Sequence, residues 1–203
     1  MNDAILHLSK DPTLFKVLAR YPQPDFERHT NYYQELVESI ISQQLSVKAA
    51  ATIVKRFRAL FAEEFPTPQQ ILALSIDELR AAGLSRQKAS YMRDLATKIL
   101  DKTIVFDALD EASNQEIIDE LTKVNGIGEW TVHMFLMFCM ARPDVLAYGD
   151  LGIRNGVTKL YGLKTLATTE DVKRIALENN WHPYESVACW YVWQSLDNKP
   201  SVY

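Results

Sequence analysis

The carboxylate of Asp150 has the surroundings in this sequence that best suit chemistry. It lies in the segment AYGDLGIRNGV, where a turn leads into an apolar-periodic stretch that predicts a helix over 151–161. A carboxylate at that point can cap the helix, because it accepts hydrogen bonds from the first backbone amides. A fixed carboxylate beside a substrate can also stabilise positive charge, or orient or deprotonate a water molecule. The residues alone favour the capping role, and the two roles are compatible.

A glycine-containing turn precedes Asp150 in the chain, within the segment LTKVNGIGEW. Gly126 and Gly128 flank Ile127 between an apolar helical run and a second long apolar run, for which we expect a helix. Glycines allow a tight turn and a close approach to a partner, and the amides that open the next helix can bind a phosphate oxygen. The pattern fits either an ordinary turn between helices or a helix-hairpin-helix, which binds a nucleic-acid backbone without reading its sequence.

Two further groups of residues could act on a ligand. The segment SQQLS (42–46) joins two apolar helical runs, so it is either an interhelix turn capped by Ser46 or a loop that presents Gln43 and Gln44. The C-terminal part holds many aromatic residues, and most of these we expect to be structural: Trp181, Tyr184, Trp190, Tyr191 and Trp193. Exposed rings attract cationic groups.

Three separated segments carry a resemblance to a known family. SIISQQLSVKAAATIVKRF, VNGIGEWTVHMFLMF and VLAYGDLGIRNGV, in this order, resemble the helix-hairpin-helix (HhH-GPD) superfamily of DNA glycosylases, within it the DNA-3-methyladenine glycosylase II group. The resemblance runs from about Tyr32 to Trp193. It implies an all-α fold of two helical subdomains with a cleft between them. Residues 31–142, with the helix-hairpin-helix, would form one subdomain, and residues 1–30 with 143–203 the other.

The resemblance implies a catalytic role for Asp150 and a base pocket lined by Trp130, Trp193 and Tyr148. Breaking an N-glycosidic bond develops positive charge on the sugar, which a fixed carboxylate stabilises. An alkylated purine is already cationic, so it leaves without protonation, and aromatic rings attract it by about 0.5–2 kcal/mol each. The implied function is a monofunctional DNA glycosylase that flips out alkylated purines, such as 3-methyladenine, and hydrolyses their glycosidic bond in base excision repair.

Trp130 decides between two kinds of glycosylase. Bifunctional relatives have a lysine at the matching position, which attacks the sugar as a Schiff-base nucleophile. Tryptophan has no such amine, and its other possible role is core packing. Two alternative functions stay open: a non-catalytic helix-hairpin-helix protein that binds DNA structure, and a bifunctional glycosylase/lyase.

The resemblance also implies contacts with DNA and with a cation. Gln44 matches the wedge residue that fills the stack when a base is flipped, although the best-known relatives have leucine there. The expected DNA contacts are Gln43, Gln44, Ser46, Lys88, Gly126, Gly128 and Thr131. Backbone carbonyls of Thr122, Val124 and Gly126 would bind Na⁺ or K⁺ at the hairpin. No cofactor is expected to be required, and an iron–sulfur cluster is not expected, because it needs four cysteines and the chain has only Cys139 and Cys189.

Composition bounds the remaining expectations. A net charge of −4 over 203 residues argues against DNA binding, and only local basic groups, such as Lys48 to Arg58 and Arg86 to Lys98, oppose that argument. No apolar run approaches the ~20 residues that span a bilayer, and the N-terminus does not resemble a signal peptide. We therefore expect an intracellular protein with no association with a membrane. A monomer is the expected state, and the partner that the resemblance implies is double-stranded DNA with alkylated bases.

Helical periodicity extends over most of the chain, and no alternating strand pattern appears. Thr67 with Pro68, Ser75 with Glu78, and Ser85 have the pattern of helix starts. Further helices are expected from Asn114 into the hairpin and over about 151–161, 170–179 and 184–196, whereas 103–113 looks irregular. One apolar stripe is formed by Leu36, Val37, Ile40 and Ile41, and another by Ile53, Val54, Phe57, Leu60 and Phe61.

Overall fold

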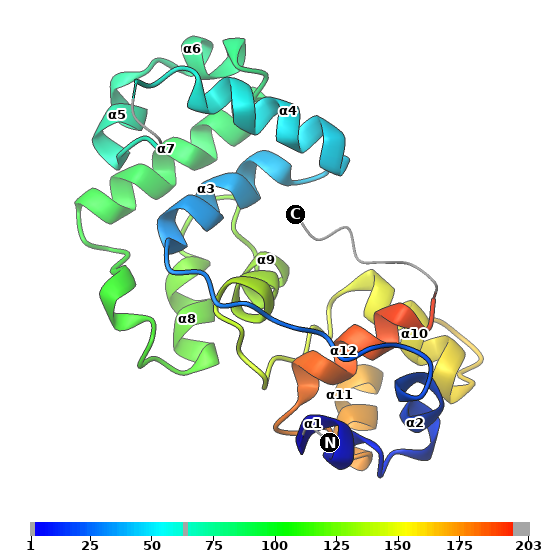
Figure 1. Ribbon diagram of the computed structural model, residues 1–203. Helices are drawn as coiled ribbons and strands as arrows, with labels where there is room; N and C mark the ends of the chain where they lie inside the picture. Colours follow the sequence, from blue (N-terminus) through cyan, green and yellow to red (C-terminus); the bar gives the residue numbers. More distant parts are fainter. Residues whose placement is uncertain (1–2, 63–64, 197–203) are drawn as a thin grey trace. The chain divides into compact units, whose positions relative to one another are not determined.

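The computed structural model describes residues 3–62 and 65–196, and every regular element in these ranges is a helix (Figure 1). The all-α prediction is therefore confirmed. The described residues divide into two compact units, which we call the middle unit (30–135) and the end unit (3–29 with 136–196). The boundary in the chain falls at 135/136 rather than at the position 142 that the resemblance implies.

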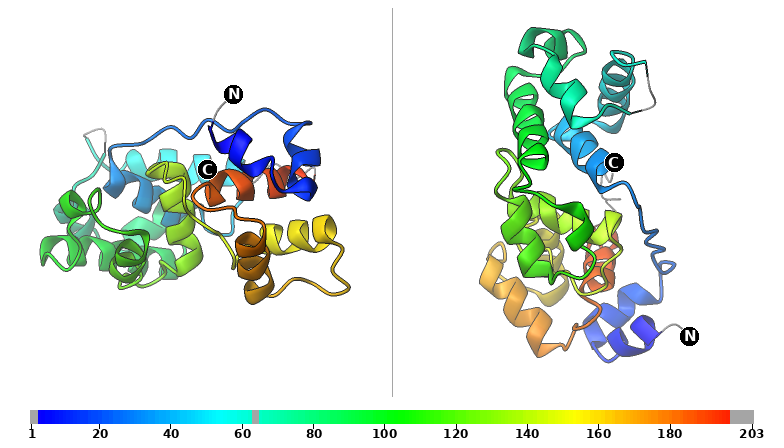
Figure 2. Two further views of the ribbon diagram at one scale, coloured as in Figure 1. Left: turned by 90° about the horizontal axis from the view of Figure 1, so that it is seen from below. Right: turned by 90° about the vertical axis from the view of Figure 1, so that its left-hand side faces the viewer.

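The middle unit is built on a long helix, α7, against which α3, α5 and α6 pack (Figures 1 and 2). Its first predicted stripe is confirmed, because Leu36, Val37, Ile40 and Ile41 are completely buried. The second stripe is buried only at Phe57, and Leu60 is 39% exposed. The elements are α3 (Tyr32–Ser42), α4 (Val47–Arg58), α5 (Pro68–Ala73), α6 (Ile76–Ala81), α7 (Arg86–Leu100), η1 (Phe106–Ala108), α8 (Asn114–Leu121) and α9 (Glu129–Met134).

The predicted helix starts of the middle unit are confirmed residue by residue. Thr67 caps α5, with Pro68 as its first residue, and Ser75 and Glu78 form a reciprocal capping box on α6. Ser85 caps α7 through the Lys88 amide, and Ser113 caps α8, which begins at Asn114. Each such cap satisfies an amide that has no partner within the helix.

The end unit packs α12 against α2 and α10, and α10 against α11. Its elements are α1 (Asp3–Leu8), α2 (Pro12–Leu18), the π-helical turn η2 (Phe135–Cys139), whose first residue is the last of the middle unit, α10 (Leu151–Tyr161), α11 (Thr169–Glu178) and α12 (Glu185–Gln194). α10 lies very close to α12, since a Cβ added to Gly156 would be 2.5 Å from Val192 Cγ1 and 2.8 Å from the Val192 carbonyl oxygen. Only glycine permits this separation of the two backbones.

The buried carboxylate of Asp11 joins the N-terminal and C-terminal segments of the end unit by hydrogen bonds. Asp11 is 1% exposed and caps α2 through the amides of Thr13 and Leu14. Its other oxygen accepts hydrogen bonds from Trp181 Nε1 (3.0 Å) and from the Tyr161 hydroxyl. Trp181 is completely buried, so it is a core residue, as expected for most of the C-terminal aromatics.

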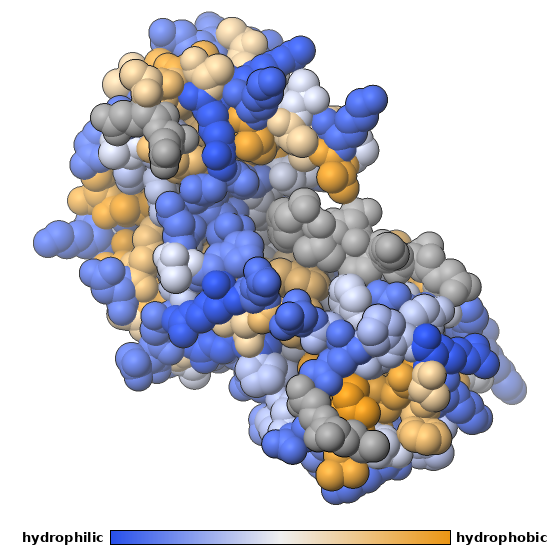
Figure 3. Space-filling view, viewed as in Figure 1, coloured by the Kyte–Doolittle hydropathy of each residue, from blue (hydrophilic) through white to orange (hydrophobic). Residues whose placement is uncertain are grey.

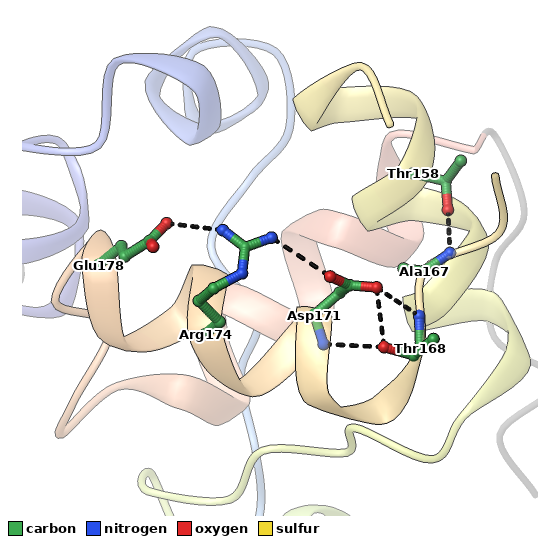
Figure 4. Close-up of polar contacts among 6 residues, drawn as sticks. All are labelled: Thr158, Ala167, Thr168, Asp171, Arg174 and Glu178. Atoms are coloured by element: carbon green, nitrogen blue, oxygen red, sulfur yellow. Dashed lines mark hydrogen bonds and ion pairs between the residues drawn. The ribbon is translucent and has the colours of Figure 1, made fainter. Parts of the chain in front are cut away.

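The connection from α10 to α11 is fixed by side-chain hydrogen bonds (Figure 4). Thr158 Oγ1 accepts the Ala167 amide (2.8 Å), and Thr168 and Asp171 form a reciprocal capping box at the start of α11. Arg174 pairs with Asp171 and with Glu178 on the same helix. The Thr158 bond joins α10, the helix that begins directly after Asp150, to the segment before α11, and the other contacts stabilise α11 itself.

Hydrophilic side chains cover much of the face that Figure 3 shows, and hydrophobic side chains are visible among them in the region of α1 and α2. The exposed large hydrophobic residues include Leu6 on α1 and Phe15 on α2. Within the described residues, no helix combines the length and the apolar character that crossing a membrane requires.

Candidate active site and DNA-binding loops

Asp150 is the N-cap of α10, with the extended backbone (φ −67°, ψ 130°) typical of that position. Its Oδ1 accepts a hydrogen bond from the Ile153 amide at 2.8 Å. The capping role that the residues alone favoured is therefore present. It also holds the carboxylate at a fixed point at the start of the helix.

The same oxygen accepts a second hydrogen bond from a distant element. Trp193 on α12 donates from Nε1 to Asp150 Oδ1 at 2.8 Å. The indole is 5% exposed and stacks on Phe138, with 6.0 Å between ring centroids and 28° between ring planes. The stacking and the burial restrain the indole, so Asp150 Oδ1 accepts hydrogen bonds from two donors that the fold positions. The expectation that Trp193 lines a base pocket stays a prediction, and the structure shows its indole bonded to the Asp150 carboxylate.

Gly152 makes this contact possible, and sequence reasoning missed it. A Cβ at Gly152 would lie 2.9 Å from Trp193 Cδ1, 3.0 Å from Trp193 Nε1 and 3.0 Å from Asp150 Oδ1. Any larger residue would displace the indole or the carboxylate. The available signal was a glycine in the first turn of a predicted helix, where glycine costs about 1 kcal/mol relative to alanine.

Tyr148, the second predicted pocket residue in the end unit, is half-buried just before Asp150. The Nζ of Lys173 on α11 lies 4.2 Å from the centroid of the Tyr148 ring, a cation–π contact. One face of the ring is thus taken by an ammonium group. A cationic base that stacks on Tyr148 would have to use the opposite face.

The predicted hairpin lies between α8 and α9 in the middle unit. Gly126 has a positive φ of 84°, which favours glycine, and Gly128 is the N-cap of α9 without a side-chain hydrogen bond. The Val132 amide donates to the Gly128 carbonyl (3.1 Å) and begins the helical ladder. The amides of residues 129–131 precede that ladder, as the geometry for binding phosphate requires.

Two residues that follow the hairpin differ from each other in exposure. Trp130 is 47% exposed, so core packing, its alternative role, is excluded. Thr131 is 5% exposed, so its side chain does not reach the surface and only its amide suits the predicted DNA contact.

The predicted wedge residue lies on a strained turn between α3 and α4. We call residues 43–46 the wedge turn. Gln44 is exposed and has a φ of +58°, a left-handed conformation that costs a non-glycine residue energy and is typical of functional loops. Ser46 caps α4 through the Ala49 amide (3.4 Å), so its capping role is confirmed.

Lys88 supports this turn from α7. Its Nζ donates to the carbonyl oxygens of Ile41 (2.7 Å) and Gln43 (2.6 Å), and burial lowers the pKa of its ammonium group. The predicted contact between Lys88 and DNA therefore gains no support, because the ammonium group is already bound to the end of α3. Gln43, by contrast, contacts the hairpin: its Nε2 donates to the Gly126 carbonyl at 2.8 Å.

Comparison with known proteins identifies the chain. Residues 37–183 match the model of the HhH-GPD superfamily of base excision DNA repair proteins. The chain belongs to this superfamily. It is 34% identical to DNA-3-methyladenine glycosylase 1 of Schizosaccharomyces pombe over 187 residues, which are 90% of this chain and 80% of that protein.

Solved structures of HhH-GPD glycosylases agree with this assignment. A 3-methyladenine DNA glycosylase from S. pombe in complex with abasic DNA has a TM-score of 0.80 at 33% identity, covering 97% of this chain and 98% of that one. A DNA-3-methyladenine glycosidase from Bacillus halodurans has a TM-score of 0.85 at 33% identity, covering 96% and 89%.

The expected binding of a monovalent cation at the hairpin stays a prediction, which can be compared with the hydrogen bonds of the carbonyl groups. The Val124 carbonyl accepts the Ile127 amide (3.1 Å) and the Gly126 carbonyl accepts Gln43 Nε2, so each retains a second lone pair. With the Thr122 carbonyl, the expected donors are chemically suited to Na⁺ or K⁺. The described residues contain no cluster of three His, Cys, Asp or Glu side chains that could hold a metal ion.

Both cysteines of this HhH-GPD protein are buried free thiols. Burial raises the pKa of Cys189 to about 12. A thiol in that state is a poor nucleophile and a poor metal ligand.

Proposed function

We propose that this protein is a monofunctional DNA glycosylase that excises alkylated purines, 3-methyladenine among them, from double-stranded DNA in base excision repair. The observation that carries the proposal is the Asp150 carboxylate held by the Ile153 amide and the Trp193 indole. The names of the relatives support the substrate class, since they are DNA-3-methyladenine glycosylases.

Asp150 would act on the sugar of the flipped nucleotide. As the C1′–N bond breaks, its electron pair goes to the departing base and positive charge develops at the sugar. A carboxylate already fixed in position stabilises that charge without reorganising. A single donor of an oxyanion hole, which does the same for a developing negative charge, is worth about 3–4 kcal/mol. Water then adds at C1′ and gives up a proton, for which the Asp150 carboxylate is the acceptor. The product is a free base and an abasic site in an intact strand.

The substrate preference would come from charge. A purine alkylated at N3 or N7 is cationic and takes up the bond pair on leaving, so no general acid is needed. The exposed indole of Trp130 is a suitable ring for such a base, and normal bases lack the charge that cation–π attraction requires. Trp130 also lacks the amine that a lyase needs to form a Schiff base.

The contacts with DNA would come from the two loops of the middle unit. The amides after Gly128 would bind the phosphate backbone, assisted by Na⁺ or K⁺ on the hairpin carbonyls, and Gln44 would fill the vacated stack. Few phosphates would be neutralised, in keeping with a net charge of −4, so the salt dependence of binding should be shallow. We further propose that the protein acts as a monomer inside the cell, where its DNA substrate is.

A protein that only binds DNA structure is the alternative. Such a protein does not need a carboxylate fixed by two donors, and this observation favours the enzyme.

The experiment that tests the proposal incubates the protein with duplex DNA treated with a methylating agent. Chromatography should show free 3-methyladenine, the strand should break only after alkali, and borohydride should trap no covalent complex. DNA binding without base release would support the structure-binding alternative instead. A trapped complex would show that the enzyme is a lyase.

A further inference from the structure

One face of α7 contacts both of the loops to which the proposed function assigns DNA binding. Lys88, Tyr91, Asp94 and Lys98 are spaced by three, three and four residues, so they lie along one side of the helix. Lys88 contacts the wedge turn, and the other three contact the hairpin (residues 122–128). All four are in the middle unit, which is compact.

Asp94 and Lys98 bind the backbone of the hairpin directly. Asp94 Oδ2 accepts the Asn125 amide at 2.7 Å and Lys98 Nζ at 2.6 Å, and Lys98 Nζ also donates to the Lys123 carbonyl at 2.6 Å. The two side chains are 23% and 20% exposed. Desolvation opposes ionisation of Asp94, but the hydrogen bonds from Lys98 and Asn125 outweigh it and lower the pKa of the carboxyl group. The Asp94 carboxyl group is therefore ionised at neutral pH, and the two side chains bind two consecutive peptide units of the hairpin.

Tyr91 fixes the hairpin sterically. A Cβ added to Gly126 would lie 1.9 Å from Tyr91 Cδ2, so the ring fills the space beside the glycine. The hairpin backbone at Gly126 thus rests on a ring of α7 on one side and accepts Gln43 Nε2 on its carbonyl.

The wedge turn joins the same network. Lys88 binds the carbonyls of Ile41 and Gln43, and Gln43 binds Gly126 of the hairpin. A closed series of contacts therefore runs from α7 to the wedge turn, across to the hairpin, and back to α7.

The charge of Asp94 makes the arrangement informative. A carboxylate beside a loop that binds phosphates repels DNA, so electrostatics alone would disfavour an acid at this position. Its hydrogen bond to the Asn125 amide gives it a positional role instead. Loops that are ordered before binding lose less conformational entropy on binding, which raises affinity.

We propose that Asp94 and Lys98 are positioning residues that hold the hairpin in its DNA-binding conformation before DNA arrives, and that Lys88 does the same for the wedge turn. The inference rests on the proposed function, since it assigns these loops to DNA. According to this inference, the negatively charged Asp94 increases the affinity for DNA.

The first test replaces Asp94 by Ala and measures the affinity for a duplex with a stable abasic-site analogue. Positioning predicts affinity at least about 10-fold weaker, whereas loss of a repelling charge alone predicts tighter binding. Asp77→Ala is the matched control, because Asp77 is an exposed carboxylate of the same unit that pairs with Arg80 on its own helix. Its affinity should stay unchanged or increase slightly. Asp94→Asn keeps an acceptor for the Asn125 amide, so it should retain more affinity than Asp94→Ala.

The second test replaces Lys98 by Met and follows binding as a function of salt. A lysine that contacts a phosphate would lower the slope of log K against log[salt] by about 0.9 when removed. Removal of a lysine that only positions the hairpin should lower the affinity and leave the slope unchanged. Hydrogen exchange adds a readout at the bond itself: the Asn125 amide should exchange faster in Asp94→Ala while the midpoint of thermal unfolding stays close to that of the wild type.

These outcomes separate the inference from the proposed function. If the wild type releases 3-methyladenine and binds the duplex, but Asp94→Ala binds as tightly or tighter, or Lys98→Met loses salt slope, the positioning role is overturned and the glycosylase assignment stands. If the wild type releases no base, the proposed function fails, and the exchange rate of the Asn125 amide still tests the structural part of the inference.

Discussion

Trp193 Nε1 lies 2.8 Å from Asp150 Oδ1, although the two residues are 43 positions apart in the chain. The bond joins α12 to the start of α10, and the close packing of these helices at Gly152 and Gly156 permits it. The carboxylate proposed to face the sugar is therefore oriented by its own helix and by a second one. Orientation of this kind is what preorganised electrostatic catalysis requires.

Trp193→Phe removes the indole donor and keeps an aromatic ring on Phe138. Because a hydrogen bond to a charged group is worth about 1.5–3 kcal/mol, single-turnover release of 3-methyladenine should slow by about 10- to 100-fold, with DNA affinity little changed. Trp190→Phe is the control, since Trp190 Nε1 is buried without a hydrogen-bond partner and its removal should cost no such bond. Equal effects of the two substitutions would mean that the Trp193 hydrogen bond is not what matters.

Gly152→Ala should slow the release of 3-methyladenine without changing the loops proposed to bind DNA. Its Cβ would fall within 3.0 Å of both Trp193 and Asp150 Oδ1, so one of them must move. Gly149→Ala is the matched control, because a Cβ there meets nothing within 4 Å. We expect base release at least about 10-fold slower for Gly152→Ala than for Gly149→Ala, measured under single-turnover conditions. Indistinguishable rates would show that Asp150 tolerates displacement.

The two hairpin glycines should respond differently to alanine. Gly126→Ala places a Cβ against the Tyr91 ring at a positive φ, so it should lower the free energy of unfolding by about 1–3 kcal/mol. At Gly128 the Cβ meets nothing, and stability should change by less than about 1 kcal/mol. DNA affinity should nevertheless fall in Gly128→Ala if the backbone there approaches a phosphate. Denaturation curves and DNA-binding curves of both variants check these two expectations. Full affinity in Gly128→Ala would show that the hairpin backbone at this glycine does not contact DNA.

His133 should make stability depend on pH. Burial lowers the pKa of this imidazole below 6.5, and the nearby Glu129 charge opposes the shift only in part. Below pH 6.5 the unfolded chain binds a proton that the folded chain does not, so the contribution of neutral His133 is present above that pH and is lost as the pH falls through the folded pKa. Between pH 6.5 and 5 the free energy of unfolding should fall less steeply with decreasing pH in His133→Gln than in the wild type. The two slopes should differ by at most about 1.4 kcal/mol per pH unit. His182→Gln, at an exposed ring, is the control, and an unchanged pH profile in His133→Gln would refute the prediction.

Local features of the fold were predictable because they depend on neighbouring residues. Thr67, Ser75 and Ser85 each cap the helix that follows, and Asp150 does so for α10. Contacts between distant elements were not. No local pattern reveals that Trp193 reaches Asp150, that Lys88 binds the end of α3, or that Asp94 holds Asn125.

The burial of apolar side chains was predicted correctly only for a helix whose whole apolar stripe is covered by other elements. The stripe of α3 is buried, but α4 buries Phe57 and leaves Leu60 exposed, since a periodic pattern does not say how much of a helix is covered. The cleft, the base pocket and the cation at the hairpin stay predictions.

The substitution Asp150→Asn tests the central claim most directly. Asparagine caps a helix as well as aspartate does and keeps an oxygen for the Ile153 and Trp193 donors, so it removes the charge and leaves the geometry. Single-turnover release of 3-methyladenine from methylated duplex DNA should fall at least about 100-fold, while the affinity for an abasic-analogue duplex stays the same or rises. Release at the wild-type rate would contradict the account, because the negative charge of Asp150 would then have no part in breaking the bond.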